Sequence, residues 1–200
     1  MGRPQKIDDT ALLDRATALF WRDGADAVTI RDLEVALGLK APAIYRRYPS
    51  KNALIESCVE RYMGRVVDSR IRRYLESSED PLEGLRSFFV TTLEPHPGEE
   101  TTRGCLLTVT ANQTVFQDPS IRAAVRDGMD RIRAGFQTTI ERGQTTGQIR
   151  TDVSAATQAM HLMLVLEGLL VLGRSGSTDV VEGVQLALDS LRPAADRAGR

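Results

Sequence analysis

Apolar residues recur every three to four positions along most of this 200-residue chain. This spacing places apolar side chains on one face of an α-helix, whereas a half-buried strand would alternate apolar and polar residues. No segment shows a sustained two-residue alternation bounded by turn residues. The sequence therefore predicts an all-α protein of about nine helices. The clearest stripe is Ile121, Val125, Met129, Ile132, Phe136 and Ile140.

Composition places the chain among ordinary soluble globular proteins. The apolar fraction is 42% and the charged fraction is 26%, both close to average values. The two cysteines and two histidines are widely separated, so their spacing predicts neither a zinc site nor a disulfide. We expect no metal and no cofactor. Residues 1–9 lack an apolar core typical of a signal peptide, and the apolar run 160–173 is shorter than a membrane span and contains Glu167. A cytoplasmic protein is expected.

Two short helices joined by a tight turn are predicted between residues 29 and 48. The run Thr29-Ile30-Arg31-Asp32 is typical of a helix start with a capping box, with Asp in place of the usual Glu. Gly38 can adopt the left-handed conformation that ends a helix. The next helix is expected over residues 40–48, with Pro42 in its first turn, where proline is tolerated. Together with a longer helix over residues 8–22, this layout resembles a trihelical helix-turn-helix.

Charge is distributed unevenly although the net charge is only -1. Residues 1–51 contain nine Lys or Arg and seven Asp or Glu, and all three lysines of the chain lie there. Residues 40–51 contain four cations and no acid. A local basic surface of this kind fits contact with phosphate groups. On charge alone, a solvated face is an equally good interpretation.

Several motifs, in order and at matching spacing, resemble those of the TetR family of bacterial regulators. Chain length and helix number agree with the family, and residues 103–107 resemble the start of its sixth helix. The resemblance is strongest over residues 2–54. The motifs are Gly2-Arg3-Pro4, Ala18-Leu19-Phe20-Trp21-Arg22-Asp23-Gly24, Thr29-Ile30-Arg31-Asp32-Leu33, Gly38-Leu39-Lys40-Ala41-Pro42-Ala43-Ile44-Tyr45 and Tyr48-Pro49-Ser50-Lys51-Asn52-Ala53-Leu54.

The resemblance implies a DNA-binding surface. Thr29 would cap the second helix and touch a phosphate, and Lys51 matches a phosphate-contacting lysine. Arg3 resembles an arm residue that enters the minor groove, although Gln5 departs from the commonest arm. Arg46 is expected to contact guanine or phosphate. The remaining positions that match base- or backbone-contacting residues are Lys40, Ala41, Pro42, Ala43 and Tyr45.

The family pattern also implies two domains, with residues 1–54 binding DNA and residues 55–200 binding a ligand and forming a homodimer. The helix expected over residues 155–172 is apolar nearly all round, so it needs partners on more than one side. We expect the two C-terminal helices to form the dimer interface, with burial inside one subunit as the alternative. The resemblance further implies an unidentified small-molecule effector and no contact with a membrane.

The effector pocket is less well defined by the sequence. Each candidate is equally consistent with an ordinary core position, and Glu167 is the polar exception in an apolar run. The candidate pocket residues are Phe88, Phe89, Cys105, Val109, Phe116, Met129, Met160, Met163 and Glu167.

Two other function classes are open at this point. An enzyme is disfavoured, because no nucleophile–base constellation, phosphate-binding Gly-rich loop or metal cluster is present. A non-catalytic helical protein-interaction module would fit the same helices, with residues 40–51 as a solvated face. The prediction is a ligand-responsive DNA-binding regulator, most simply a repressor that a small molecule releases from a palindromic operator.

Overall fold

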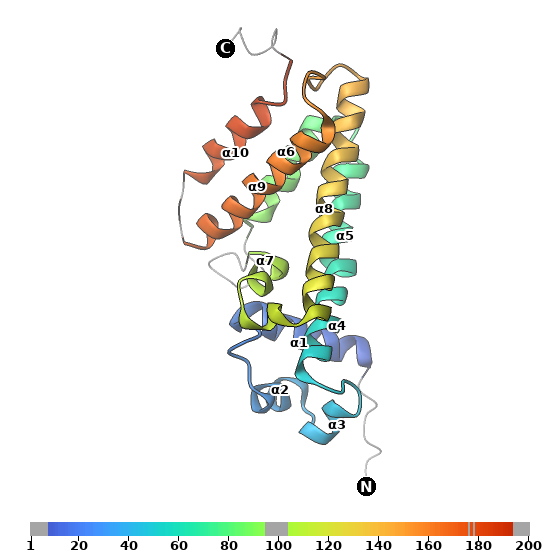
Figure 1. Cartoon of the computed structure of the whole chain (residues 1–200), viewed down its shortest axis with the longest axis vertical. Coiled ribbons are helices and arrows are strands. Elements are labelled where there is room, and N and C mark those ends of the chain that lie inside the picture. Colours follow the sequence, from blue (N-terminus) through green and yellow to red (C-terminus); the bar gives the residue numbers. More distant parts are fainter. Residues whose placement is uncertain (1–7, 95–103, 176, 178, 194–200) are drawn as a thin grey trace. The chain divides into compact units, whose positions relative to one another are not determined.

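The computed structural model describes residues 8–94, 104–175, 177 and 179–193. Within these ranges the chain is helical and contains no strand (Figure 1), which confirms the predicted all-α class. Counting the helical run 51–76 as one, the described ranges hold nine α-helices. The chain forms two compact units. Unit 1 comprises residues 1–65 and 105–126, and unit 2 comprises residues 66–104 and 127–200.

Unit 1 is built from four N-terminal helices and a returning segment. The helices are α1 (Asp9–Asp23), α2 (Ile30–Leu37), α3 (Ala41–Tyr45) and α4 (Lys51–Tyr62). The returning segment holds α7 (Leu106–Ala111), a 3-10 turn (Thr114–Gln117) and the start of α8 (Pro119–Thr145). The apolar faces of these helices meet in one core, because Leu12, Phe20, Leu33, Leu54 and Ile121 are each at most 1% exposed.

Local sequence signals set the helix ends in unit 1. Asp8 precedes α1, and its carboxylate accepts a hydrogen bond from the Thr10 N–H at 3.2 Å. The helix stops at Gly24, which has φ 82°, a conformation that L side chains rarely adopt. Ser50 caps α4, since its hydroxyl accepts from the Ala53 N–H at 3.0 Å.

Residues 51–76 form one continuous helical run. Their interior is not uniformly α-helical. Two π-helical stretches, η1 (Met63–Val67) and η2 (Ile71–Glu76), flank the short α5 (Asp68–Arg70). The sequence contains no proline there that would announce a change of pitch.

Unit 2 contains α5, η2, α6 (Pro81–Thr92), the rest of α8, α9 (Ala155–Arg174) and α10 (Val180–Asp189). Its core is centred on Phe136, whose ring stacks on Phe89 at 5.6 Å and meets Phe88 edge-on at 5.2 Å. Arg142 donates to the carbonyls of Leu75 and Glu76 at 3.0 and 3.2 Å. It thereby satisfies carbonyl groups that the end of η2 leaves without helical partners.

The two units do not coincide with the expected boundary after residue 54. Helix α4 and residues 105–126 belong to unit 1 because they complete the core under α1. The helix α1 packs chiefly against α4, and both α1 and α4 contact α7. A helix-turn-helix of about fifty residues buries only part of its apolar surface by itself, and these additional helices cover more of it.

The apolar run near the C-terminus lies in a 20-residue helix, α9, which by length and composition could cross a membrane. The prediction that this apolar run is too short to span a membrane is therefore wrong. Within the apolar window, however, 44% of residues are buried in the protein. Leu162, Leu166 and Leu169 lie on that buried face at 0%, 3% and 4% exposure. Core helices of soluble proteins share this pattern, so one such helix is weak evidence for a membrane.

Candidate DNA-binding site

Local geometry fixes both ends of α2, the helix that precedes the turn to α3. Thr29 and Asp32 form the predicted capping box: the Asp32 N–H donates to the Thr29 hydroxyl oxygen at 3.3 Å, and the Thr29 N–H donates to the Asp32 carboxylate at 2.8 Å. The Thr29 hydroxyl, which donates to the Asp32 carboxylate at 2.6 Å, and then the Thr29 N–H hold the pKa of Asp32 below its usual range. At the other end, Gly38 has φ 66° and ψ 26°, the left-handed conformation expected for a helix end.

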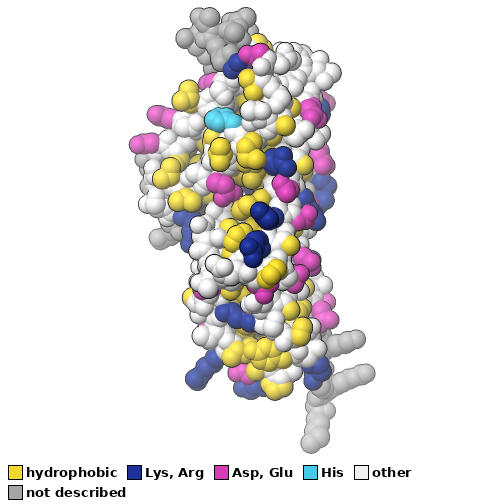
Figure 2. Space-filling model, viewed as in Figure 1, with side chains coloured by type: hydrophobic (Ala, Val, Ile, Leu, Met, Phe, Trp, Pro, Cys, Tyr) yellow, Lys and Arg dark blue, Asp and Glu magenta, His cyan; other side chains and the backbone are white. Residues whose placement is uncertain are grey.

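Helix α3 presents the residues that the sequence predicts as the reading surface. Ile44 is 2% exposed and anchors the helix in unit 1. Lys40, Pro42, Tyr45 and Arg46 are exposed, whereas Ala41 and Ala43 are half-buried. Small side chains on this face permit close approach to a groove floor. Over α2 and α3, Figure 2 shows hydrophobic side chains at the surface with Lys and Arg beside them.

The N-terminus of α3 receives a cap that the sequence analysis did not anticipate. The Ala41 N–H donates to Glu34 Oε1 at 2.7 Å, so the carboxylate of α2 takes up a donor at the start of α3. A seven-residue separation across a turn carries no local sequence signature. This contact ties α3 to α2 and leaves the side chains of Lys40 and Arg46, rather than the Ala41 amide, as the polar groups of the reading surface.

Helix α3 is shorter than the predicted 40–48. It ends at Tyr45, and residues 46–50 form turns. Pro49 disfavours helical geometry at the residue before it, which accounts for the early end. Arg47 points back into unit 1: its Nε donates to Asp9 at 3.1 Å and its Nη1 donates to the Ala43 carbonyl at 3.2 Å. Arg46 forms no such side-chain hydrogen bond among the described residues, so its side chain is less constrained than that of Arg47.

The predicted phosphate anchors lie on different elements. Thr29 is exposed at the start of α2, and Tyr45 is 44% exposed at the end of α3. Lys51 is the first residue of α4 and is half-buried. Its burial lowers the pKa of the ammonium, while the nearby carboxylates of Asp26 and Asp32 oppose this effect. Arg3 lies outside the described residues.

Three contacts fasten the helix-turn-helix to the returning segment. The Asp26 carboxylate accepts from the Thr114 and Val115 N–H groups at 2.6 and 3.1 Å. The Ala25 N–H donates to Gln113 Oε1 at 2.8 Å, directly beside Gly24, where an added Cβ would lie 2.2 Å from the Gln113 amide nitrogen. These residues are 88 or more positions apart in sequence, so no local pattern could have revealed them.

Charged and aromatic contacts join α1 to the helical run 51–76. Asp14 on α1 accepts from Arg61 at 2.7 Å and pairs with Arg65 at 2.8 Å, so these two arginines are not merely solvated. Trp21 is 6% exposed and meets Tyr62 edge-on at 4.9 Å. It is a core residue, as its apolar setting predicts.

The predicted pocket residues are divided between the two units. Cys105, Val109 and Phe116 lie in unit 1, whereas the other six lie in unit 2. Cys105 is buried beside Tyr62, with the hydroxyl oxygen and the sulfur 3.4 Å apart. Phe88 and Met163 are buried core residues, Met129 and Glu167 are half-buried, and Met160 is 47% exposed. Only Phe89 lines the apolar cavity described next.

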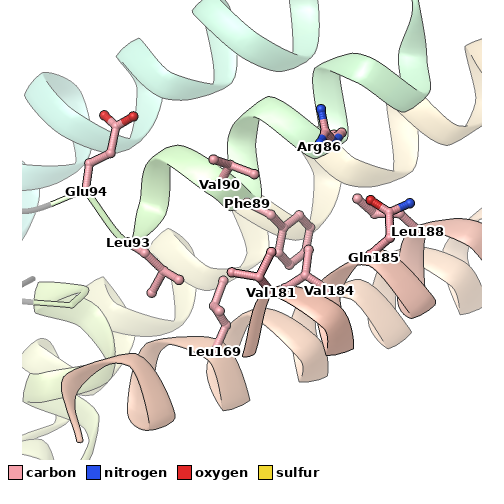
Figure 3. Close-up of a pocket in the computed structure, with 10 residues that line it drawn as sticks. All are labelled: Arg86, Phe89, Val90, Leu93, Glu94, Leu169, Val181, Val184, Gln185 and Leu188. Carbon is pink, nitrogen blue, oxygen red and sulfur yellow. The ribbon is translucent and has the colours of Figure 1, made fainter. Parts of the chain in front are cut away.

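An apolar cavity of about 310 Å³ lies within unit 2, between α6, α9 and α10 (Figure 3). The sequence pattern did not reveal most of the residues that line this cavity. They come from three helices, and no local sequence signal shows how those helices pack together. Arg86 and Gln185 lie at one end of the cavity, and Leu93 and Glu94 at the other. The ten lining residues are Arg86, Phe89, Val90, Leu93, Glu94, Leu169, Val181, Val184, Gln185 and Leu188.

A capped α2–turn–α3 element, packed on α1 with an exposed basic face, defines a helix-turn-helix DNA-binding protein. Residues 12–58 match the model of the bacterial regulatory proteins of the tetR family, and residues 81–185 match the tetracyclin repressor-like C-terminal domain. The second match alone covers more than half of the chain. The protein therefore belongs to the TetR family, which is a family of transcription regulators rather than enzymes.

Individual relatives agree with this assignment along nearly the whole chain. The HTH-type transcriptional repressor ComR of Escherichia coli is 24% identical over 191 residues, covering 96% of this chain and 90% of ComR. The HTH-type transcriptional repressor AcnR of Corynebacterium jeikeium is 29% identical over 196 residues, covering 94% of this chain and 96% of AcnR.

Solved structures show the same fold. A cysteine mutant of the TetR family regulator CifR, complexed with 26-base-pair operator DNA, superposes with a TM-score of 0.82 at 24% identity, covering 94% of this chain and 99% of CifR. The reduced form of Escherichia coli NemR superposes with a TM-score of 0.82 at 20% identity, covering 94% of this chain and all of NemR.

Proposed function

We propose that this protein is a repressor that binds a palindromic operator as a homodimer and is released by a small molecule. The observation that carries the proposal is the exposed face of α3, which offers Lys40, Tyr45 and Arg46 on a helix anchored by Ile44. The repressor names of ComR and AcnR and the operator complex of CifR support it. Such a protein acts in the cytoplasm, where the chromosome lies.

Within this proposal the exposed residues have separate roles. Lys40 and Arg46 read base edges in the major groove, where a cation can donate to guanine O6 and N7. Ala41, Pro42 and Ala43 allow close approach of the backbone to the bases. Thr29, Tyr45 and Lys51 contact phosphate oxygens, which set position without reading sequence. Arg3 enters the adjacent minor groove.

The proposed dimer interface is the apolar outer face of α9 and α10. Leu164 is 67% exposed and Leu186 is 73% exposed. In a monomer these apolar side chains would remain in contact with water. Gly168 and Gly183 are exposed and have nothing within 4 Å of an added Cβ, so partner helices could approach their backbones closely. Figure 2 shows hydrophobic side chains reaching the surface over these two helices. The other large apolar residues exposed there are Met160, Val171, Leu172 and Val181.

Dimerisation and release are linked in this proposal. One α3 contacts only a few base pairs, whereas a two-fold dimer reads two half-sites about 34–36 Å apart. A ligand that prefers a dimer with a different separation of the two α3 helices weakens operator binding. The weakening is limited by the ligand's differential affinity for the two states.

Selection of bound fragments from the source genome, followed by gel-shift titration at two salt concentrations, tests the proposal. Binding through phosphate contacts must weaken steeply as salt rises. Lys51→Ala is expected to weaken binding to all sequences alike, whereas Lys40→Ala and Arg46→Ala are expected to change sequence preference, by about 1–3 kcal/mol per lost base contact.

Arg133→Ala is the matched control for loss of one positive charge, because Arg133 pairs with Asp130 on α8, away from α3 in sequence. Its operator affinity should equal that of the wild type. If no genomic fragment binds, the proposal is wrong and the protein-interaction module is favoured. If Lys40→Ala and Arg46→Ala both keep the wild-type preference, the reading surface is misplaced.

A further inference from the structure

We propose that the cavity between α6, α9 and α10 is the effector site, and that its ligand is an elongated apolar molecule with one anionic group at one end. The inference rests on the proposed function, because it names the ligand class of a ligand-released regulator. It is carried by the position of the polar side chains around an otherwise apolar cavity of about 310 Å³.

The cavity walls determine the body of the ligand. Phe89, Leu169, Val184 and Leu188 are at most 7% exposed and form an aliphatic and aromatic floor. The side chains of that floor have no hydrogen-bond donor or acceptor, so polar groups placed against them would lose their hydrogen bonds to water. The volume is at the lower end of the range for small-molecule sites. The body is therefore apolar and small.

The cavity is elongated along α6. Its lining runs from Arg86 to Leu93, and seven residues of α-helix rise roughly 10 Å. Figure 3 shows Arg86 and Gln185 at one end of this path and Glu94 at the other. A molecule of about that length would lie along α6 with its two ends in different electrostatic surroundings.

The two ends select the charge and direction of the ligand. Arg86 is exposed, and among the described residues its only ion-pair partner is Glu83, at 3.9 Å. A carboxylate reaching Arg86 would form a stronger, charge-assisted hydrogen bond. The Gln185 amide beside it could donate a second one. At the opposite end, the Glu94 carboxylate would repel an anion, so only one orientation is favourable.

A second, polar cavity of about 180 Å³ adjoins the Arg86 end and shares Arg86, Gln185 and Leu188 with the first. Its charged walls are largely occupied: Asp80 caps α6 by accepting from the Leu82 and Glu83 N–H groups, and Arg192 pairs with Asp189 at 3.2 Å. Water can therefore reach the head group here. A ligand with an apolar body and a hydrated anionic end fits both spaces.

The site also touches the proposed dimer interface. Val181 on α10 lines the cavity and is 58% exposed, whereas Leu186, on the same helix, is 73% exposed and does not line it. Filling the cavity would press on α10 from within while its outer face contacts the partner. This gives the ligand a direct means of favouring one dimer arrangement over another.

Isothermal titration calorimetry of the full-length protein without DNA tests the proposal. The probes are octanoate, decanoate and 4-butylbenzoate, each with its corresponding alcohol and all kept below micelle-forming concentrations. We expect at least one carboxylate to bind more tightly than its alcohol. Arg86→Gln should weaken carboxylate binding about tenfold and leave alcohol binding unchanged, because it removes the positive charge and keeps a polar side chain.

Two further variants make the result specific. Val90→Trp fills the half-exposed rim without altering the buried floor and should abolish binding of carboxylate and alcohol alike. Arg133→Gln is the control, since Arg133 and Asp130 form an (i, i+3) pair on α8 just as Arg86 and Glu83 do on α6. It should bind the probes as the wild type does.

Three outcomes would overturn the proposal: no carboxylate binds, binding survives in Val90→Trp, or Arg86→Gln and Arg133→Gln have equal effects. A Val90→Trp protein that changes its oligomeric state instead of its probe binding also overturns it, because the cavity then holds a partner helix. Operator binding by the wild-type protein, measured without probe, stays intact in all four cases if the proposed function is right. Failure of the proposed function appears instead as absent operator binding.

Discussion

Gly38 offers a direct test of how backbone geometry holds the reading helix. Its φ of 66° lies in the left-handed region, and nothing lies within 4 Å of a Cβ added there. Gly38→Ala therefore adds no clash, and its whole effect is the cost of left-handed geometry for an L residue. That cost is roughly 1–2 kcal/mol of unfolding free energy. Gly38→Asn should lose less, because Asn tolerates this conformation.

Gly64 is the matched control. It also has open space around an added Cβ, but it lies inside a helix and has no positive φ. Gly64→Ala should therefore raise stability by roughly 0.5–1 kcal/mol, because alanine loses less conformational freedom in a helix. The two alanine substitutions add the same methyl group and differ only in backbone conformation, so opposite signs are expected.

Urea denaturation followed by circular dichroism measures all three variants. The protein concentration must be equal throughout, since the stability of a dimer depends on protomer concentration. Operator affinity of Gly38→Ala should fall together with its stability, because the turn sets the direction of α3. Equal stability of Gly38→Ala and wild type, or equal losses for Gly38→Ala and Gly38→Asn, would refute the geometric reasoning.

Two further predictions concern titratable groups. Arg61, followed by Arg65, holds the pKa of Asp14 below its ordinary value, so the stabilisation is present above about pH 4 and is lost as pH falls through the lowered pKa. Asp14→Asn should lower the free energy of unfolding by no more than about 1 kcal/mol at pH 7, because the pair is about a third exposed. In urea titrations, the difference in unfolding free energy between this variant and the wild type should shrink toward pH 3. A difference that stays constant with pH would contradict the assignment. Burial raises the pKa of the Cys58 thiol to about 12. Iodoacetamide at pH 8 should therefore modify Cys58 only when urea unfolds the protein, which peptide mass spectrometry can measure. Rapid labelling of the native protein would contradict the buried position.

Local sequence signals predicted much of the fold correctly. Thr29 and Gly38 mark the two ends of α2 in the structure as the sequence predicts. These signals work because a cap acts on backbone groups within about four residues. The apolar spacing likewise identified the buried faces of α1 and α8, since the period of a helix is a local property.

Contacts between distant residues were outside the reach of these signals. The pairing of Arg47 with Asp9 and the capping of Thr114 by Asp26 join residues 38 and 88 positions apart. Periodicity shows which face of a helix is apolar, but it does not show which other helix covers it. The assignment of residues 105–126 to the same unit as the helix-turn-helix therefore came only from tertiary packing.

The two proposed sites differ most in how far the sequence alone could predict them. The reading surface lies within one short stretch, so the sequence alone determined its helices, its turn and most of its exposed cations. The apolar cavity takes its walls from α6, α9 and α10, and of the predicted pocket residues only Phe89 lines it. A core position and a cavity-lining position have the same residue types. Only the tertiary structure decided between them, because the difference lies in the space left between packed helices.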